Sequence, residues 1–398
     1  MNLKKILCKV FKKDSVNLDL MLCFTCLPSD DGNGFQAAEA NYLLTNIERS
    51  ANYTLCKQMT TGIKYPDYPT VKTNKRFKRS LRRYLRLFPN VKNRFFRVDL
   101  DKKYNVKLAY GLFANAIYPY LKFFEENKIP FMFTLYPGGG FSLNNPLSDS
   151  RLRELFSSPM FKKVIVTMPI TKKYLLENNF CSEDKIEYIY GGVPQNKEFK
   201  NKLKYQKDKS TFDVCFVAHK YTSIGEDKGF DVVVETARRL IKSNKDIHFH
   251  FVGPWENILD VSDISSENLH FYGLQKPQFF VDFYSKMDIM LSPNRFQMIN
   301  LGNFDGFPLG IEGAFAGVYL MCADPLNMKP ETPLHNGKGF EVINHNPQEI
   351  CDKILSKMKN LDELYSDSLE QQKLAQTVFG TDGQLYKRLE IIKREINI

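Results

Sequence analysis

Short apolar segments alternate with longer helical segments along this 398-residue chain, and this alternation constrains the fold more than any other feature. In the first half, buried strands are predicted for LDLMLCFTCL (18–27), VKLAYGL (106–112) and PFMFTLYP (130–137). Helical patterns follow these strands, as in the βα units of a parallel sheet. The chain is therefore predicted to belong to the α/β class.

A second series of the same kind begins with DVCFVAH (213–219) and continues with IHFHFVG (247–253). The stretch 196–210 between the two series is polar and rich in lysine, which is typical of an interdomain linker. We therefore predict two Rossmann-like domains with parallel sheets that face each other. Ligands of such sheets bind at the carboxyl ends of the strands, here in the cleft between the domains.

The domain boundaries follow from these two series. The N-terminal domain is assigned to residues 1–195 and the C-terminal domain to residues 211–380. Residues 381–398 carry apolar side chains at helical spacing. We predict a final helix that packs back onto one of the two domains, and we assign it to the N-terminal domain.

The net charge of +11, from 56 Lys+Arg and 45 Asp+Glu, is concentrated in the N-terminal half. Residues 72–97 hold eleven basic residues and no acidic one, with apolar residues at helical spacing. The pattern indicates an amphipathic basic helix whose charged face includes Arg76, Arg79, Arg82 and Arg83. Such a face fits an anionic membrane surface. A solvated helix face and a nucleic-acid contact are the alternatives.

The first thirteen residues, MNLKKILCKVFKK, are also amphipathic and basic, which suits either a membrane interface or a solvated helix. Lysines interrupt the apolar run, so no signal peptide is predicted, and no run is long enough for a transmembrane helix. The eight scattered cysteines are typical of reduced thiols, and the pair Cys23 and Cys26 has no second pair nearby to complete a zinc site. We therefore predict a cytoplasmic protein, peripheral at the inner face of the membrane, without a metal.

A loop followed by a helix that opens with an acid is the most informative motif of the sequence. The acid is Glu312, and a carboxylate at this position can accept two hydrogen bonds from the vicinal hydroxyls of a ribose. Capping of its own helix is the alternative role. The backbone N–H groups of the loop suit an anionic or hydroxyl-rich ligand. The loop residues are Asp305, Gly306, Phe307, Pro308 and Leu309.

This loop, the helix of Glu312 and the later segment 337–340 together resemble the donor-binding core of GT-B glycosyltransferases of the retaining, family 4 type. The spacing differs, because the family has seven residues between its two acids and this chain has six between Asp305 and Glu312. The resemblance implies a GT-B architecture and a nucleotide-sugar donor bound by residues 211–380. It also implies hexosyl transfer to a glycan or lipid-linked acceptor with retention of configuration, as in bacterial surface-polysaccharide biosynthesis, without a cofactor.

The resemblance also assigns cationic residues to the donor diphosphate. In the family an Arg/Lys pair holds this group, and Lys228 before Gly229 matches the lysine. His219 stands where the arginine is usual, with Lys220 beside it. Fixed cations stabilise the charge that develops on a leaving diphosphate more in the transition state than in the ground state. We therefore predict Lys228, Glu312 and Asp305 as catalytic residues, and His219, Lys220 and the loop as donor-binding residues.

Two glycine-containing loops follow strands of the N-terminal domain. Gly32 and Gly34 come after the first strand, where glycine permits close backbone approach to phosphate or sugar, although an ordinary turn fits equally well. Three consecutive glycines follow the strand 130–137, which suggests close ligand approach or a mobile loop. The family commonly places a histidine here, and this domain contains none. We predict an acceptor-side site at Tyr136, Gly138, Gly139 and Gly140.

Two other functions are compatible with the sequence. A nucleotide-sugar epimerase of the same fold would use carboxylates around both faces of the sugar and needs no basic membrane face. A non-catalytic protein on the same scaffold would bind membranes or nucleic acid without binding nucleotides. The placement of the positive charge in amphipathic segments favours a membrane surface over nucleic acid as the partner.

Overall fold

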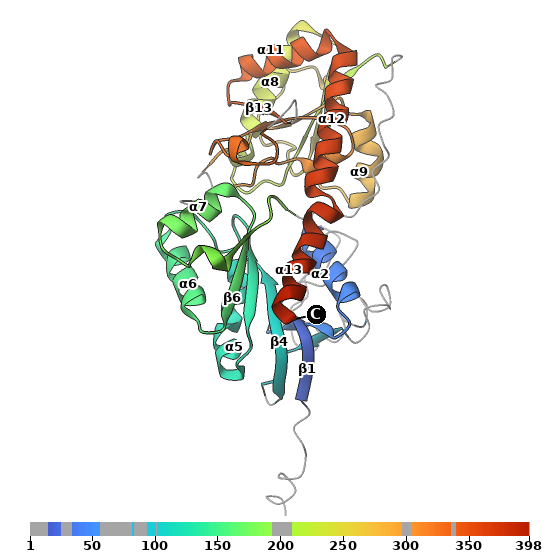
Figure 1. Cartoon of the computed structure of the whole chain (residues 1–398). Coiled ribbons are helices and arrows are strands. Elements are labelled where there is room, and N and C mark those ends of the chain that lie inside the picture. Colours follow the sequence, from blue (N-terminus) through green and yellow to red (C-terminus); the bar gives the residue numbers. More distant parts are fainter. Residues whose placement is uncertain are drawn as a thin grey trace, which may run out of the picture.

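The computed structural model describes residues 15–24, 34–55, 82, 94–100, 102–192, 209–296, 302, 304–335 and 340–397. These residues form two α/β lobes, one above the other in Figure 1. A helical segment near the C-terminus runs from the upper lobe onto the lower one. Within the described ranges, no helix is both long enough and apolar enough to cross a membrane.

The N-terminal lobe is built on seven parallel strands in the order β3-β2-β1-β4-β5-β6-β7. The order reverses between β1 and β4, as in a Rossmann-type sheet. The strands are β1 (Ser15–Leu22), β2 (Ser50–Thr54), β3 (Phe95–Arg97), β4 (Lys103–Leu112), β5 (Phe131–Leu135), β6 (Phe161–Val166) and β7 (Ile186–Tyr188). The helices are α2 (Gly34–Asn46), α4 (Ala114–Ile117), α5 (Leu121–Asn127), α6 (Pro146–Ser157) and α7 (Pro169–Glu177).

The central strand β5 follows the hydrophobic pattern, and strands β2 and β3 do not. Strand β5 is buried along its whole length, as the apolar run FMFTL predicts. Strand β2 is also buried throughout, but its sequence is SANYT. The side chain of Asn52 accepts a hydrogen bond from the Phe24 N–H at 2.9 Å, which satisfies this buried amide. Because β2 buries polar residues, and β3 has three residues, the sequence analysis did not predict either strand.

The C-terminal lobe has six parallel strands in the order β10-β9-β8-β11-β12-β13, which reverses between β8 and β11. The strands are β8 (Phe212–Val217), β9 (Ile247–Val252), β10 (Leu269–Phe271), β11 (Ile289–Ser292), β12 (Tyr319–Ala323) and β13 (Glu341–Ile343). The helices are α8 (Phe230–Ser243), α9 (Pro277–Phe283), α10 (Ile311–Phe315), α11 (Pro347–Met358), α12 (Leu361–Phe379) and α13 (Lys387–Ile396). The predicted α/β class with two parallel sheets is confirmed.

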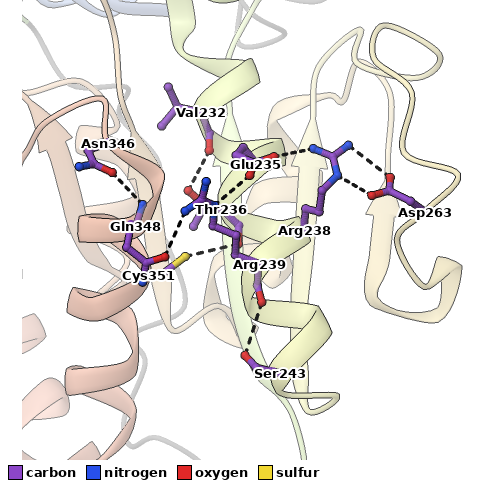
Figure 2. Close-up of polar contacts among 10 residues, drawn as sticks. All are labelled: Val232, Glu235, Thr236, Arg238, Arg239, Ser243, Asp263, Asn346, Gln348 and Cys351. Atoms are coloured by element: carbon purple, nitrogen blue, oxygen red, sulfur yellow. Dashed lines mark hydrogen bonds and ion pairs between the residues drawn. The ribbon is translucent and has the colours of Figure 1, made fainter.

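Helix α8 is held in place by polar contacts on its outer face (Figure 2). Glu235 accepts hydrogen bonds from both Arg238 and Arg239, at 2.7 and 2.8 Å. Arg238 also pairs with Asp263 at 2.6 Å, and Arg239 donates to Gln348 of α11 at 3.1 Å. The contacts of Arg238 and Arg239 tie α8 to the loop that contains Asp263 on one side and to α11 on the other.

The C-terminal helices join the two lobes. Helix α12 lies on the C-terminal lobe, where the Gln371 side chain exchanges two hydrogen bonds with the backbone of Leu320. One π-helical turn, Asp382–Tyr386, follows α12. Helix α13 then packs on the N-terminal sheet through Leu389 and Ile392, next to α2 in Figure 1. The chain therefore ends on the lobe in which it began.

Candidate functional site

A cavity of about 410 Å³ lies between the two lobes, at the carboxyl ends of their strands. The N-terminal lobe lines it with residues that follow β4, β5, β6 and β7, namely Phe113, Tyr136, Pro137, Met168, Gly191 and Gly192. The C-terminal lobe lines it with Tyr221, residues 304–312 and Phe315, and the end of α12 adds Phe379. This is the position at which facing Rossmann-type sheets bind ligands.

A buried lysine contacts the wall of this cavity. Lys228 ends the short turn η4 (Glu226–Lys228), and its side chain is 7% exposed. Its Nζ donates to Oδ2 of Asp305 at 2.6 Å, and Asn294 donates to the same oxygen at 2.8 Å. Asp305 itself lines the cavity. The structure therefore brings together two of the three predicted catalytic residues, and Asn294 joins them without having been predicted.

Glycine is required where η4 meets α8. Gly229 has φ +73°, and a Cβ there would lie 2.1 Å from the carbonyl oxygen of Pro293. The turn can therefore pack directly against the end of β11. Arg295 reinforces this contact, because its guanidinium donates two hydrogen bonds to Asp231 at 2.7 and 2.8 Å. The Lys-Gly pair of the sequence motif thus places Lys228 beside the chain that leads to Asp305.

Glu312, the third predicted catalytic residue, lies in the first turn of α10 and lines the cavity. Its carboxylate makes no hydrogen bond or ion pair to another residue in the described ranges. Burial, and then the charge of Glu312, raise the pKa of Tyr284, which places the carboxylate near that ring. Glu312 therefore has acceptor capacity that the helix itself does not use.

The loop 304–310 is fixed against the N-terminal lobe. The Tyr190 hydroxyl donates to the carbonyl oxygen of Phe307, which precedes a cis bond to Pro308. Phe304 packs edge-on against Phe141 with ring centroids 5.9 Å apart. A Cβ at Gly306 would come 2.8 Å from the Met168 side chain. Residues Gly306, Phe307, Pro308 and Leu309 all line the cavity, and the two lobes meet along this loop.

His219 and Lys220 lie on the loop after β8 but are not among the residues that line the cavity. His219 is exposed, and the Lys220 Nζ donates to the carbonyl oxygen of Ser223 at 3.0 Å. Tyr221, the next residue along the chain, does line the cavity, and its ring centroid is 5.2 Å from the Lys228 Nζ. The sequence analysis missed Tyr221, although it follows the two predicted residues directly.

The three glycines after β5 have φ of +73°, +55° and +92°, and none of them lines the cavity. A Cβ on Gly139 would lie 2.2 Å from the ring of Phe113, and one on Gly140 would lie 2.8 Å from Asn115. Glycine is therefore needed here for packing beneath Phe113. Tyr136 does line the cavity, and its ring centroid is 5.4 Å from that of Phe113.

A buried charged pair lies behind Tyr136. Arg388 of α13 and Glu39 of α2 are both fully buried, with Nε and Oε2 3.7 Å apart. Arg388 donates from Nη2 to the Tyr136 hydroxyl at 3.0 Å and from Nη1 to the Gln384 side chain at 2.8 Å. Tyr110 donates to Glu39. No local pattern signals this network, because its members are far apart in the sequence.

Several predicted residues have no described environment. Gly32, Arg76, Arg79 and Arg83 lie outside the described residues, and so do the first thirteen residues. Gly34 is the first residue of α2, and Arg82 is described only as a single exposed helical residue. In the part of the chain that the structure describes, no group of three or more His, Cys, Asp or Glu side chains is placed to hold a metal ion.

No model of a known protein family matches this sequence, and no curated protein matches it. Solved structures of similar fold are found, however. HepE from Anabaena, in a crystal structure with UDP, aligns with 95% of this chain and 100% of its own, with 10% identity and a TM-score of 0.62. Sucrose-phosphate synthase from Thermosynechococcus elongatus aligns with 95% of this chain and 98% of its own, with 12% identity and a TM-score of 0.58.

A third similar structure is a Listeria monocytogenes protein assigned as a UDP-N-acetylglucosamine 2-epimerase. It aligns with 94% of this chain and 97% of its own, with 12% identity and a TM-score of 0.51. All three alignments cover both lobes. The chain therefore has the GT-B fold, as predicted, and the identities are too low to transfer an activity.

Proposed function

We propose that this protein is a glycosyltransferase that moves a sugar from a nucleotide-sugar donor, foremost a UDP-sugar, to a glycan or lipid-linked acceptor with retention of configuration. The proposal rests above all on one cavity between the lobes, which Asp305 and Glu312 line and where Lys228 is bonded to Asp305. The HepE structure supports it, because that protein has the same fold and holds UDP.

In the proposed reaction, the bond between the anomeric carbon and the diphosphate oxygen breaks, and the acceptor oxygen bonds to the same carbon. The proton of the acceptor hydroxyl passes to the released diphosphate or to water, so that the products are the glycoside and UDP. Lys228 stabilises the negative charge that develops on the diphosphate. Because Asp305 and Asn294 already hold this site in place, little reorganisation is needed when the charge develops.

The two acids have separate roles in this proposal. Glu312 accepts hydrogen bonds from the ribose hydroxyls of the donor, since its carboxylate faces the cavity without a partner in the described part of the chain. Asp305 contacts the transferred sugar and orients Lys228. His219 and Lys220 have a weaker role at the diphosphate, because His219 is exposed and Lys220 is bonded to Ser223, whereas Lys228 is bonded to Asp305 of the cavity wall.

The donor site can be tested by thermal shift with UDP, GDP, ADP and dTDP. UDP is expected to raise the melting temperature, because a ligand that binds only the folded state stabilises it. Lys228→Ala and Glu312→Ala should each remove most of this shift. Lys242→Ala, an exposed lysine of α8 in the same lobe, is the matched control and should keep it. The absence of a shift with every nucleotide would overturn the proposal.

Epimerisation of a nucleotide-sugar is the second candidate, and the Listeria structure is the observation in its favour. An epimerase needs ionisable groups on both faces of the sugar. The described residues that line the N-terminal side of the cavity carry no carboxylate, which favours transfer. Incubation with UDP-N-acetylglucosamine separates the two: formation of the 2-epimer without any acceptor would replace the transferase proposal.

We also place the enzyme at the inner face of the membrane, in surface-polysaccharide biosynthesis. This part of the proposal rests on the basic segment 72–97, most of which lies outside the described residues. Each basic residue adds on the order of 1 kcal/mol at an anionic surface. Replacement of Arg79, Arg82 and Arg83 by Glu should abolish co-sedimentation with phosphatidylglycerol vesicles. Unchanged co-sedimentation would remove this segment from the proposal.

A further inference from the structure

The loop after β8 brings an aromatic ring to the cavity wall. Tyr221 lines the cavity and is 62% exposed. The Nζ of Lys228 lies over its ring, 5.2 Å from the centroid. The Lys228 side chain is only 7% exposed, and its Nζ also bonds to Oδ2 of Asp305 at 2.6 Å. The ammonium group of Lys228 therefore contacts a ring and a carboxylate that both belong to the cavity wall.

Hydrogen bonds between their sequence neighbours hold Tyr221 and Lys228 together. Thr222 follows Tyr221, and its hydroxyl shares its proton between Oδ1 of Asp227 at 2.6 Å and Oε2 of Glu226 at 2.7 Å. The Thr222 N–H also donates to Oδ1 of Asp227 at 3.3 Å. Asp227 precedes Lys228 and is 2% exposed. The loop of the ring is thus bonded to the turn of the lysine, which fixes the ring next to the ammonium group.

A ring in this position changes the surroundings of the Lys228 ammonium group. The face of an aromatic ring attracts a cation, and the attraction is larger where water is excluded. Without the ring, the Nζ of Lys228 would be open to the water of the cavity. A hydrated ammonium group must lose water before it binds phosphate oxygens, whereas a desolvated one has already lost it. Its attraction to a negative charge is also less weakened by solvent.

We propose that Tyr221 is a positioning residue of the donor site, whose ring keeps the ammonium group of Lys228 in place and desolvated for the donor diphosphate. This inference rests on the proposed function, in which Lys228 binds that diphosphate. Tyr221 then acts through Lys228, and not by contact with the base or the sugar of the donor. Its effect is therefore confined to ligands that carry the diphosphate and to proteins that carry the lysine.

The first test compares UDP with uridine, which has no phosphate, by NMR titration of the full chain. Tyr221→Ala should weaken the binding of UDP about five-fold, the ratio that one partly desolvated cation–π contact provides. The affinity for uridine should stay as in the wild type. An unchanged affinity for UDP, or an equal loss for uridine, would overturn the inference and leave the donor site intact. A wild-type protein that binds no nucleotide would contradict the proposed function itself.

Tyr221→Phe keeps the ring and removes the hydroxyl, so its affinity for UDP should stay within about two-fold of the wild type. A loss as large as that of Tyr221→Ala would assign the effect to the hydroxyl and overturn the inference. Tyr386→Ala is the matched control, because Tyr386 is also exposed but is not among the residues that line the cavity. This variant should bind UDP as the wild type does.

A double variant separates action through Lys228 from direct contact with the donor. Lys228→Ala combined with Tyr221→Ala should bind UDP as weakly as Lys228→Ala alone, because the ring has no ammonium group left to support. A further five-fold loss in the double variant would show that the ring contacts the donor itself, and would overturn the inference. The melting temperature of each variant without ligand shows that it is folded.

Discussion

The two lobes share one topology and differ in where they keep their charges. At the strand ends of the C-terminal lobe, Lys228, Asp305 and Asn294 form a polar cluster that reaches the cavity. In the N-terminal lobe, Arg388 and Glu39 are equally well placed behind the strand ends, but both are completely buried and aromatic rings cover them. The pair Lys228–Asp305 thus lies at the cavity in one lobe. In the other lobe the pair Arg388–Glu39 lies in the interior, where Arg388 bonds to the cavity-lining residue Tyr136.

This difference predicts opposite responses to mutation. A buried pair without full hydrogen bonding contributes to the architecture, and removal of one partner leaves an uncompensated charge inside the protein. A pair at a cavity in which one partner is partly exposed, as Asp305 is, contributes less to stability than a fully buried pair and more to ligand binding. The four variants below test this contrast, from the largest expected effect to the smallest.

Arg388→Met should be the most damaging change. It leaves the Glu39 carboxylate buried without its cation, so the free energy of unfolding should fall by about 3–5 kcal/mol in urea denaturation. Glu39→Gln in the same chain should restore part of this loss. Arg394→Met, at an exposed arginine of α13 that pairs with Glu187, should cost less than about 1 kcal/mol. Equal losses for the two arginine variants would contradict the contrast between the lobes.

Gly139→Ala should destabilise the N-terminal wall through two separable effects. The positive φ costs about 1–2 kcal/mol for any residue with a Cβ. The clash with the Phe113 ring adds about 1–3 kcal/mol, as in overpacked cores. Gly138→Ala shares the positive φ, and a Cβ there meets no atom within 4 Å, so it isolates the first effect. Equal unfolding free energies of the two variants would show that Gly139 does not support the ring.

Asp305→Asn should change both stability and binding. Lys228 is buried and Asp305 is one-third exposed, and the new amide oxygen can still accept the hydrogen bond of Lys228, so the change should cost about 1–3 kcal/mol, less than Arg388→Met. UDP should bind a few-fold more tightly, because Lys228 is released from a competing carboxylate. Calorimetric titration with UDP measures this change. A weaker affinity for UDP would show that Asp305 itself contacts the nucleotide.

The smallest expected effect is on the pH dependence of stability, and it concerns His270 in β10, the outermost strand of the C-terminal lobe. Burial, and then the charges of His250 and His248, lower the pKa of His270 below its ordinary value of 6.5, and Asp213 opposes them. His270 is therefore protonated more readily in the unfolded chain, and its contribution to stability is lost as the pH falls below about 6.5. His270→Gln should reduce the decrease in melting temperature between pH 7 and pH 5. If the melting temperature of the variant fell by as much as that of the wild type, the pH dependence would come from other groups.

Much of the fold could be predicted from local patterns. Apolar runs such as FMFTL identify central strands, because a parallel sheet buries both faces of its central strands. The same reasoning fails for β2, which buries Asn52. The side chain of Asn52 accepts a hydrogen bond from the backbone N–H of Phe24, which follows β1, so this polar residue can be buried. It also fails for β3, which ends a segment dominated by basic residues. These two strands, one at the edge of the sheet and one next to it, depend on their neighbours more than on their own composition.

The site divides in the same way. Short motifs with a recognisable order singled out Glu312, Asp305 and Lys228, and the structure places Glu312 and Asp305 at one cavity and Lys228 against Asp305; their roles stay predictions. Tyr221 and Asn294 were missed, since their positions next to Lys228 and Asp305 depend on distances that no local pattern encodes. His219 and Lys220 were predicted to bind the donor because they follow the strand that became β8. In the structure they lie in the loop after β8 and are not among the residues that line the cavity.

The sequence by itself determined the two-sheet architecture and the residue types available at the strand ends. These features depend on hydrophobic periodicity and on glycine, which act over a few residues. Only the tertiary structure decided which charges reach the cavity. Arg388 and Tyr136 are 252 positions apart and meet because α13 returns to the first lobe, so their contact depends on packing between elements that the chain brings together last.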